Sequence, residues 1–116
     1  MVKFKDEMKI DKKENMRGGD GIVTITNHAE KKDMKHCRLF CEISIPAGGS
    51  IGEHDHVDEI EYYLIKEGAG IVVDDGVDKK IGPGDLVITG GGASHSIRNT
   101  GSSPLVFTAV IITDTE

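Results

Sequence analysis

Two histidines, His54 and His56, are separated by one residue, and Glu61 follows five residues after the second. Side chains alternate between the two faces of a β-strand, so the two imidazoles share a face and can converge on one cation. Five is an odd step, so a bend across residues 57–60 is needed to bring the carboxylate of Glu61 to the same ion. Imidazole and carboxylate ligands together suit a transition metal better than calcium or magnesium. Taken alone, the pattern also fits a polar surface strand.

Length and charge exclude several classes of protein. The chain has 116 residues, the length of one ordinary domain. Its 14 basic and 20 acidic residues give a net charge of −6, which opposes binding to nucleic acid or to anionic membranes. The one basic cluster, residues 31–36, is interrupted by Asp33 and contains no aromatic residue, which indicates a solvated loop.

The chain shows no sign of membrane insertion or secretion. It contains no apolar run near the length needed to span a bilayer, so no transmembrane segment is expected. The first seven residues lack the apolar core of a signal peptide, which predicts a cytoplasmic protein. If Cys37 and Cys41 lie on one strand, their α-carbons are about 13 Å apart, too far for a disulfide. We expect both to be reduced and buried.

The distribution of glycine is typical of an all-β domain. Most of the 15 glycines fall between short apolar runs, and residues 2–16 before them indicate either a weak helical face or an irregular arm. Eight or nine short strands are too many for one flat sheet, which favours a two-sheet jelly roll or a squat barrel. The predicted strands are residues 21–26, 38–45, 51–56, 61–65, 71–73, 77–81, 86–89, 94–98 and 105–112.

The spacing of glycines and ligands across the middle of the chain resembles the two sequence motifs of the cupin family. In the first motif the intervals are five, one, four and six residues, between Gly48, His54, His56, Glu61 and Gly68. In the second they are five, one, two and three residues, between Gly84, Gly90, Gly92, His95 and Asn99. All spacings fit, and one identity departs, because the family usually has proline at the position of Gly90. This change loosens the corner before His95 and leaves the ligands intact.

The resemblance implies an all-β double-stranded β-helix, the jelly-roll barrel of cupins, with residues 1–21 as an N-terminal arm and 22–116 as the cupin domain. It implies one divalent transition metal, which is Mn, Fe, Ni, Cu or Zn, with ligands His54, His56, Glu61 and His95. The family commonly forms homodimers in which edge strands pair or swap, a part that the arm is placed to take.

The charges and number of these ligands predict the net charge of the metal site and its open coordination positions. Three neutral imidazoles and one carboxylate leave a divalent ion with a net charge near +1. If the ion is six-coordinate, two adjacent positions remain for water, dioxygen or a bidentate anion. The ligands bind only when deprotonated, so metal should be lost as the pH falls through about 6.

Other residues are candidates for contact with a bound molecule. Tyr63 and Ile65 share strand parity with Glu61, and Ile97 shares it with His95, so all three are expected to face the cavity. Tyr63 is the first candidate for a substrate contact, and a packed core tyrosine is an equally open reading. Arg38 would meet an anionic substrate if its face of strand 38–45 is the inner one, and otherwise lies on the surface. Glu59 replaces Glu61 as ligand if the bend falls differently.

The open metal site predicts a small metalloenzyme that acts on a carboxylate, diol or sugar-like molecule, and the resemblance to cupins implies a dioxygenase, decarboxylase or isomerase type of reaction. The alternative is a non-catalytic module that uses its metal to bind or sense a small anionic ligand. A third reading is a closed, purely structural metal site. The fold by itself does not choose among these functions.

Overall fold

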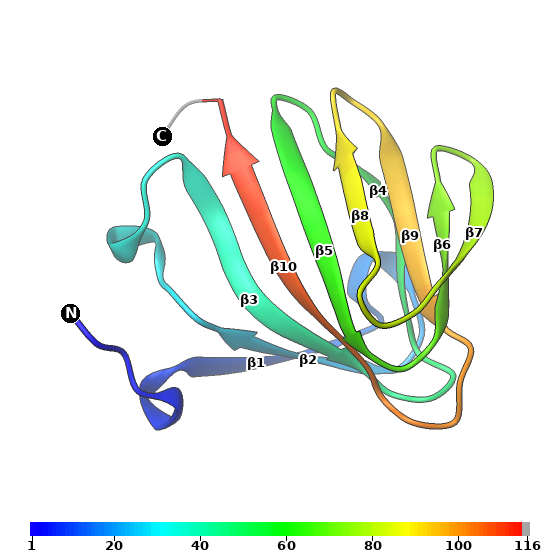
Figure 1. Ribbon diagram of the computed structural model, residues 1–116, viewed down its shortest axis with the longest axis horizontal. Helices are drawn as coiled ribbons and strands as arrows, with labels where there is room; N and C mark the ends of the chain where they lie inside the picture. The colour runs from blue at the N-terminus through cyan, green and yellow to red at the C-terminus, as the bar shows by residue number, and fades with distance from the viewer. Residues whose placement is uncertain (115–116) are drawn as a thin grey trace.

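The computed structural model describes residues 1–114, and in that part of the chain ten strands and three short 3₁₀ helices follow one another (Figure 1). The strands are β1 (Lys9–Glu14), β2 (Ile22–Asn27), β3 (Cys37–Ile45), β4 (Ser50–Asp55), β5 (Glu59–Glu67), β6 (Gly70–Asp74), β7 (Val77–Ile81), β8 (Leu86–Gly90), β9 (Ser94–Asn99) and β10 (Leu105–Thr113). The 3₁₀ helices are η1 (Lys5–Glu7), η2 (Met16–Gly18) and η3 (Lys31–Asp33). No helix within residues 1–114 is long and apolar enough to cross a bilayer.

The strands form two antiparallel sheets, which together make the double-stranded β-helix expected from the sequence. The larger sheet has six strands in the order β1-β2-β3-β10-β5-β8, and the smaller has four in the order β4-β9-β6-β7. Neighbours in space are distant in sequence, because β10 lies between β3 and β5, and β9 lies between β4 and β6. The fold therefore brings the histidines and glutamate of the first motif and the histidine of the second motif to the same interior.

The inward faces of both sheets supply that core. Along β3 the residues Cys41, Ile43 and Ile45 are buried, whereas Phe40 is 40% exposed on the opposite face. This alternation settles which face of β3 is the inner one. Cys37 and Cys41 are free thiols, and Cys41 is buried as expected while Cys37 is only partly buried. The other fully buried apolar residues of the core include Val23, Ile51, Tyr63, Ile65, Val72, Ile97, Leu105 and Phe107.

The N-terminal segment differs from both readings of its sequence. Residues 9–14 form strand β1, which pairs with β2 in antiparallel register from Lys9 opposite Asn27 to Glu14 opposite Ile22. Five of its six residues are exposed, so no alternation of polar and apolar residues marks the strand. Backbone pairing with β2, which a local pattern does not reveal, accounts for its conformation.

The apolar run of residues 86–88 favours a buried strand, and this prediction is wrong for one face of β8. Val87 and Thr89 are buried, but Leu86 and Ile88 are 53% and 56% exposed. Leu86 and Ile88 lie on the outward face of the larger sheet, and no other layer covers this face within the described residues.

The connection between β4 and β5 provides the bend expected across residues 57–60. Asp58 has a φ of 58°, the left-handed conformation that reverses the chain over a few residues. The backbone of His56 is held by hydrogen bonds to the β8–β9 connection, from its N–H to Ala93 O (3.1 Å) and to its carbonyl from Gly92 N–H (2.8 Å). The turn is therefore fixed against the segment that leads to His95.

Candidate metal centre

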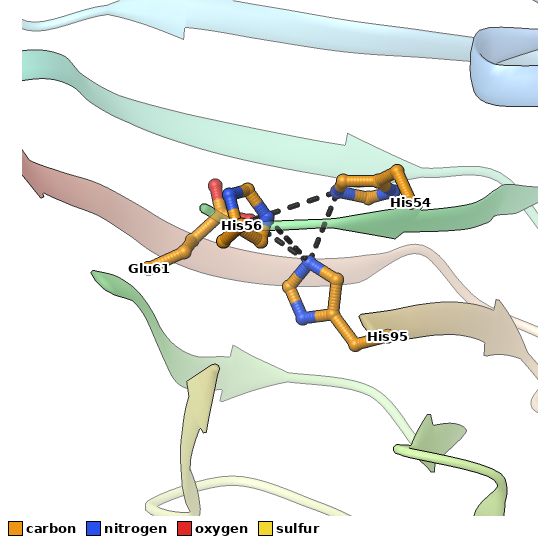
Figure 2. A group of neighbouring side chains, drawn as sticks. All are labelled: His54, His56, Glu61 and His95. Atoms are coloured by element: carbon orange, nitrogen blue, oxygen red, sulfur yellow. Dashed lines mark hydrogen bonds and ion pairs between the residues drawn. The ribbon is translucent and has the colours of Figure 1, made fainter. Parts of the chain in front are cut away.

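Four side chains from both sheets converge on one point inside the barrel (Figure 2). His54 is on β4, His56 follows it in the turn, Glu61 is on β5 and His95 is on β9. Each offers one ligand atom, and these four atoms lie within 4.8 Å of one another. The side chains of His56, Glu61 and His95 are 2%, 4% and 1% exposed, whereas that of His54 is 10% exposed. Solvent therefore reaches the cluster from the side of His54.

The separations between the ligand atoms have the spacing of a coordination shell. His95 Nε2 lies 3.0 Å from His54 Nε2, 3.0 Å from His56 Nε2 and 3.0 Å from Glu61 Oε1. Glu61 Oε1 lies 2.9 Å from His56 Nε2 and 3.8 Å from His54 Nε2. Ligands bound at about 2.1 Å occupy adjacent octahedral positions about 3.0 Å apart and tetrahedral positions about 3.4 Å apart. The short separations fit the octahedral case better.

The outer nitrogens of two imidazoles fix which atoms point into the cluster. His54 Nδ1 lies 2.8 Å from the carbonyl oxygen of Gly52, and His56 Nδ1 lies 2.5 Å from Glu59 Oε2. A carbonyl and a carboxylate only accept hydrogen bonds, so each Nδ1 must carry the proton. In a neutral imidazole the remaining nitrogen, Nε2, then presents a bare lone pair. Both lone pairs are directed at the centre of the cluster.

The centre consequently has an excess of electron pairs. His95 Nδ1 lies 2.8 Å from Thr89 Oγ1, a hydroxyl that can donate or accept, so His95 brings at most one proton to the centre. Glu61 Oε1 is buried and has no hydrogen-bond partner within the described residues. Two lone pairs and an unpartnered carboxylate oxygen at contact distance repel one another, and a cation placed among them removes that repulsion. The four residues therefore fit a divalent metal.

The electrostatics of the cluster agree with that reading. Burial raises the pKa of Glu61, but in the metal-free protein the hydrogen bonds and charges of His54, His95 and His56, when these imidazoles are protonated, more than offset this and hold it at about 2. Burial lowers the pKa of His95, although the charge of Glu61 opposes the effect. Both groups are thus kept in the deprotonated form that binds metal at neutral pH.

Tyr63 is the aromatic residue closest to the cluster. Its ring stacks on that of His95, with centroids 4.9 Å apart and planes inclined by 21°, and packs against Phe107 at 4.5 Å. Its hydroxyl lies 3.5 Å from His95 Nε2. Burial and the charge of Glu61 raise the pKa of Tyr63 well above 10, so its hydroxyl retains its proton and remains a hydrogen-bond donor.

The other predicted contact residues lie in different surroundings. Ile65 and Ile97 are 2% and 1% exposed members of the hydrophobic core. The side chain of Arg38 is 45% exposed and binds Glu59 with Nε and Nη2 at 2.7 Å each. Its contact with a substrate stays a prediction. Glu59 reaches Nδ1 of His56, on the far side of the ring from the cluster, so it does not replace Glu61 as ligand.

Sequence reasoning missed the groups that orient the ligands. Thr89 lies directly opposite Glu61 in the pairing of β5 with β8, and this register is what places it beside His95. The sequence would have identified Thr89 only if the register between β5 and β8 had been known, because residues directly opposite each other face the same side of a sheet. The carbonyl of Gly52 carries no side-chain signal at all. The role of Glu59 could be inferred only once its distance to Nδ1 of His56 was measured.

Comparisons with known proteins agree with the fold. The family model described as the cupin domain matches residues 41–111. A protein of Thermotoga maritima named oxalate-binding protein is 42% identical over 113 residues, which cover 97% of this chain and 93% of that protein. The crystal structure of a "predicted oxalate decarboxylase" from Thermotoga maritima has a TM-score of 0.92 at 42% identity, covering 97% of this chain and 99% of that one.

A more distant relation concerns the fold alone. The polyketide cyclase RemF from Streptomyces resistomycificus has a TM-score of 0.75 at 19% identity, covering 97% of this chain and 80% of that one. At this identity the shared barrel carries no information about substrate.

Proposed function

The chain belongs to the cupin family, and we propose that its three histidines and one glutamate hold a divalent transition metal that captures a small bidentate carboxylate, with oxalate as the first candidate. The observation that carries this proposal is the cluster of bare lone pairs around the unpartnered oxygen of Glu61. The ligands are His54, His56, Glu61 and His95. The bound metal supplies positive charge and open coordination positions.

Charge and geometry favour a dicarboxylate as guest. A divalent ion with one carboxylate ligand keeps a net charge near +1, which attracts an anion into an otherwise apolar barrel. A six-coordinate ion held by these four ligands would have two positions left for a chelating guest. The relatives support the choice of oxalate, because one is named for binding it and one for its predicted decarboxylation.

The residues of the chain have separate tasks in this proposal. His54 borders the solvent-accessible side of the cluster, so a guest enters past its ring. Tyr63 keeps its proton and donates a hydrogen bond to an oxygen atom at the metal. Phe107 packs behind Tyr63 and keeps water away from that side of the site.

The surroundings of the site favour binding over catalysis. Decarboxylation requires a group that delivers a proton to the product carbon at neutral pH. Glu59 is held by Arg38 and His56, and the pKa of Tyr63 is too high for efficient proton delivery. The metalloenzyme remains the second candidate, because the open metal positions and the relative described as a predicted oxalate decarboxylase favour it.

Oxalate titration of the metal-loaded protein tests the proposal. We expect saturable binding of oxalate by calorimetry, much weaker binding of acetate, which cannot chelate in the same way, and loss of both in His95→Ala. Metal content measured by elemental analysis of protein purified without added metal identifies the ion. Oxalate binding that is equal with and without metal contradicts the proposal.

The same preparation separates the three functional readings. Formate and carbon dioxide formed from oxalate, and abolished by His95→Ala, would establish the enzyme. Binding without product supports the binding module. A metal that neither exchanges nor binds added anions would indicate the closed structural site and contradict our proposal.

A further inference from the structure

We infer that Glu59, held in place by Arg38, is a positioning residue that makes His56 the strongest nitrogen ligand of the proposed metal. This inference rests on the metal site of the proposed function, but not on the identity of the guest. It concerns the Nδ1 side of the ring, which faces away from the cluster.

The contacts form a continuous chain from the surface to the ligand. Arg38 donates from Nε to Glu59 Oε1 and from Nη2 to Glu59 Oε2, both at 2.7 Å. Glu59 Oε2 in turn accepts from His56 Nδ1 at 2.5 Å. The two parallel bonds from the planar guanidinium fix the plane of the carboxylate, and the carboxylate fixes the rotation of the imidazole.

His56 is distinguished from the other two imidazoles by the charge of its partner. His54 Nδ1 faces the backbone carbonyl of Gly52, and His95 Nδ1 faces the neutral hydroxyl of Thr89. Among the three histidine ligands, His56 alone has an ionised partner. A carboxylate that accepts the Nδ1 proton increases the electron density at Nε2 and strengthens its bond to a cation.

The surroundings of Glu59 suit this task, because two hydrogen bonds from the guanidinium of Arg38 hold its carboxylate. The side chain of Glu59 is 13% exposed and that of His56 is 2% exposed, so little water competes for the bond between them.

Arg38 is more exposed than the residues it supports. Its side chain is 45% exposed, and it lines a cavity of about 530 Å³ together with Glu59 and Cys37. An ion pair so open to solvent adds little to the free energy of unfolding. Its effect on the metal should consequently exceed its effect on stability.

The chain offers a matched control in a second ion pair between the same two strands. Lys66 on β5 binds Glu42 on β3 at 2.7 Å, and β10 lies between these strands just as it lies between Arg38 and Glu59. Within the described residues, the contact that Glu42 and Lys66 make is with each other and not with a ligand of the metal. The variant Glu42→Gln removes a comparable cross-strand pair and leaves the cluster untouched.

The experiment measures the dissociation constant of the metal by competition with a chelator, in the absence of oxalate. We expect Glu59→Gln to weaken metal binding 10- to 100-fold, the usual range for loss of a hydrogen-bonded partner of a ligand. Arg38→Gln should weaken it less, and the double variant should match Glu59→Gln, because Arg38 acts through Glu59. Glu42→Gln should bind metal like the unmodified protein.

The visible absorption of the cobalt-loaded protein provides a readout that a purely structural role would not change. We expect the bands to shift in Glu59→Gln and to stay in place in Glu42→Gln. If Glu59→Gln does not fold, Arg38→Gln carries the same comparison. Equal metal affinity and spectra in Glu59→Gln and the unmodified protein would overturn the inference, as would an equal loss of affinity in Glu42→Gln. Metal binding without oxalate binding overturns only the proposed function.

Discussion

The chemistry of the site depends on hydrogen bonds that each ligand makes away from the metal. The sequence supplies three imidazoles of one kind, but the structure gives their Nδ1 atoms three different partners, a carbonyl, a carboxylate and a hydroxyl. These partners decide which nitrogen carries the proton in His54 and His56. The cluster is thereby preorganised, since two lone pairs face the centre before a cation binds.

Replacing Tyr63 with phenylalanine removes the one hydroxyl that lies at 3.5 Å from His95 Nε2 while preserving the stacked ring. A hydrogen bond to a charged group contributes about 1.5 kcal/mol or more, so we expect oxalate affinity to fall about tenfold. Metal affinity should change less. Calorimetry with oxalate and chelator competition for the metal measure the two effects separately. An unchanged oxalate affinity would show that the hydroxyl of Tyr63 does not contribute to oxalate binding.

The metal-free protein should lose stability as the pH falls. The pKa of His95 is lowered from 6.5 and that of Glu61 is lowered from 4.5 to about 2. The unfolded chain therefore takes up protons first, and the stabilisation is complete above pH 6.5 and lost progressively below it. Urea unfolding at pH 8, 6 and 4.5 measures this, with His95→Asn as the control that flattens the upper part of the profile. A free energy of unfolding independent of pH over this range contradicts the prediction.

Two turns position the elements that carry the ligands. The β4–β5 bend returns the chain so that Glu61 faces the same point as His56. The N-terminal turn around η2 packs along β4, where the carbonyl oxygen of Arg17 occupies the space of a side chain at Gly52. The carbonyl of Gly52 itself accepts the hydrogen bond from His54 Nδ1. The arm before the barrel is thus connected to the metal centre through one glycine.

The variant Gly52→Ala tests this connection. Its added methyl group would overlap the carbonyl oxygen of Arg17, so either the turn or β4 must move. We expect the free energy of unfolding to fall by about 1–3 kcal/mol and metal affinity to weaken, because the partner of His54 is displaced. Gly82→Ala is the matched control, since nothing lies within 4 Å of the added atom. Thermal unfolding of both variants measures the difference in stability. Equal stability of Gly52→Ala and Gly82→Ala would contradict the proposed contact between the turn and β4.

The whole molecule leaves one face of its larger sheet apolar and exposed. Leu64, Leu86 and Ile88 are 48%, 53% and 56% exposed, and the pairing of β5 with β8 sets Leu64 beside Leu86. An exposed apolar sheet face of this kind is typical of an interaction surface. The homodimer that the family resemblance implies remains a prediction, and this face is a second place for the contact besides the N-terminal arm.

Analytical ultracentrifugation tests the homodimer and locates its interface. We expect the unmodified protein to sediment as a dimer and the variant Leu86→Asp with Ile88→Asp as a monomer that still binds metal. Removal of residues 1–8, which precede β1, should leave the dimer intact if the sheet face is the interface. A monomer produced by that removal alone would assign the contact to the arm, and a monomeric unmodified protein would refute the dimer.

The sequence alone determined the barrel and the composition of its metal cluster. Ligand types and intervals are local properties, and alternation along β3 marks its buried face, so these features could be predicted. Only the tertiary structure decided that β1 is a strand and that Glu59 contacts Nδ1 of His56 instead of joining the metal cluster. Each of these depends on which segments lie side by side across the two sheets. That pairing joins residues far apart in the chain, and no local pattern encodes it.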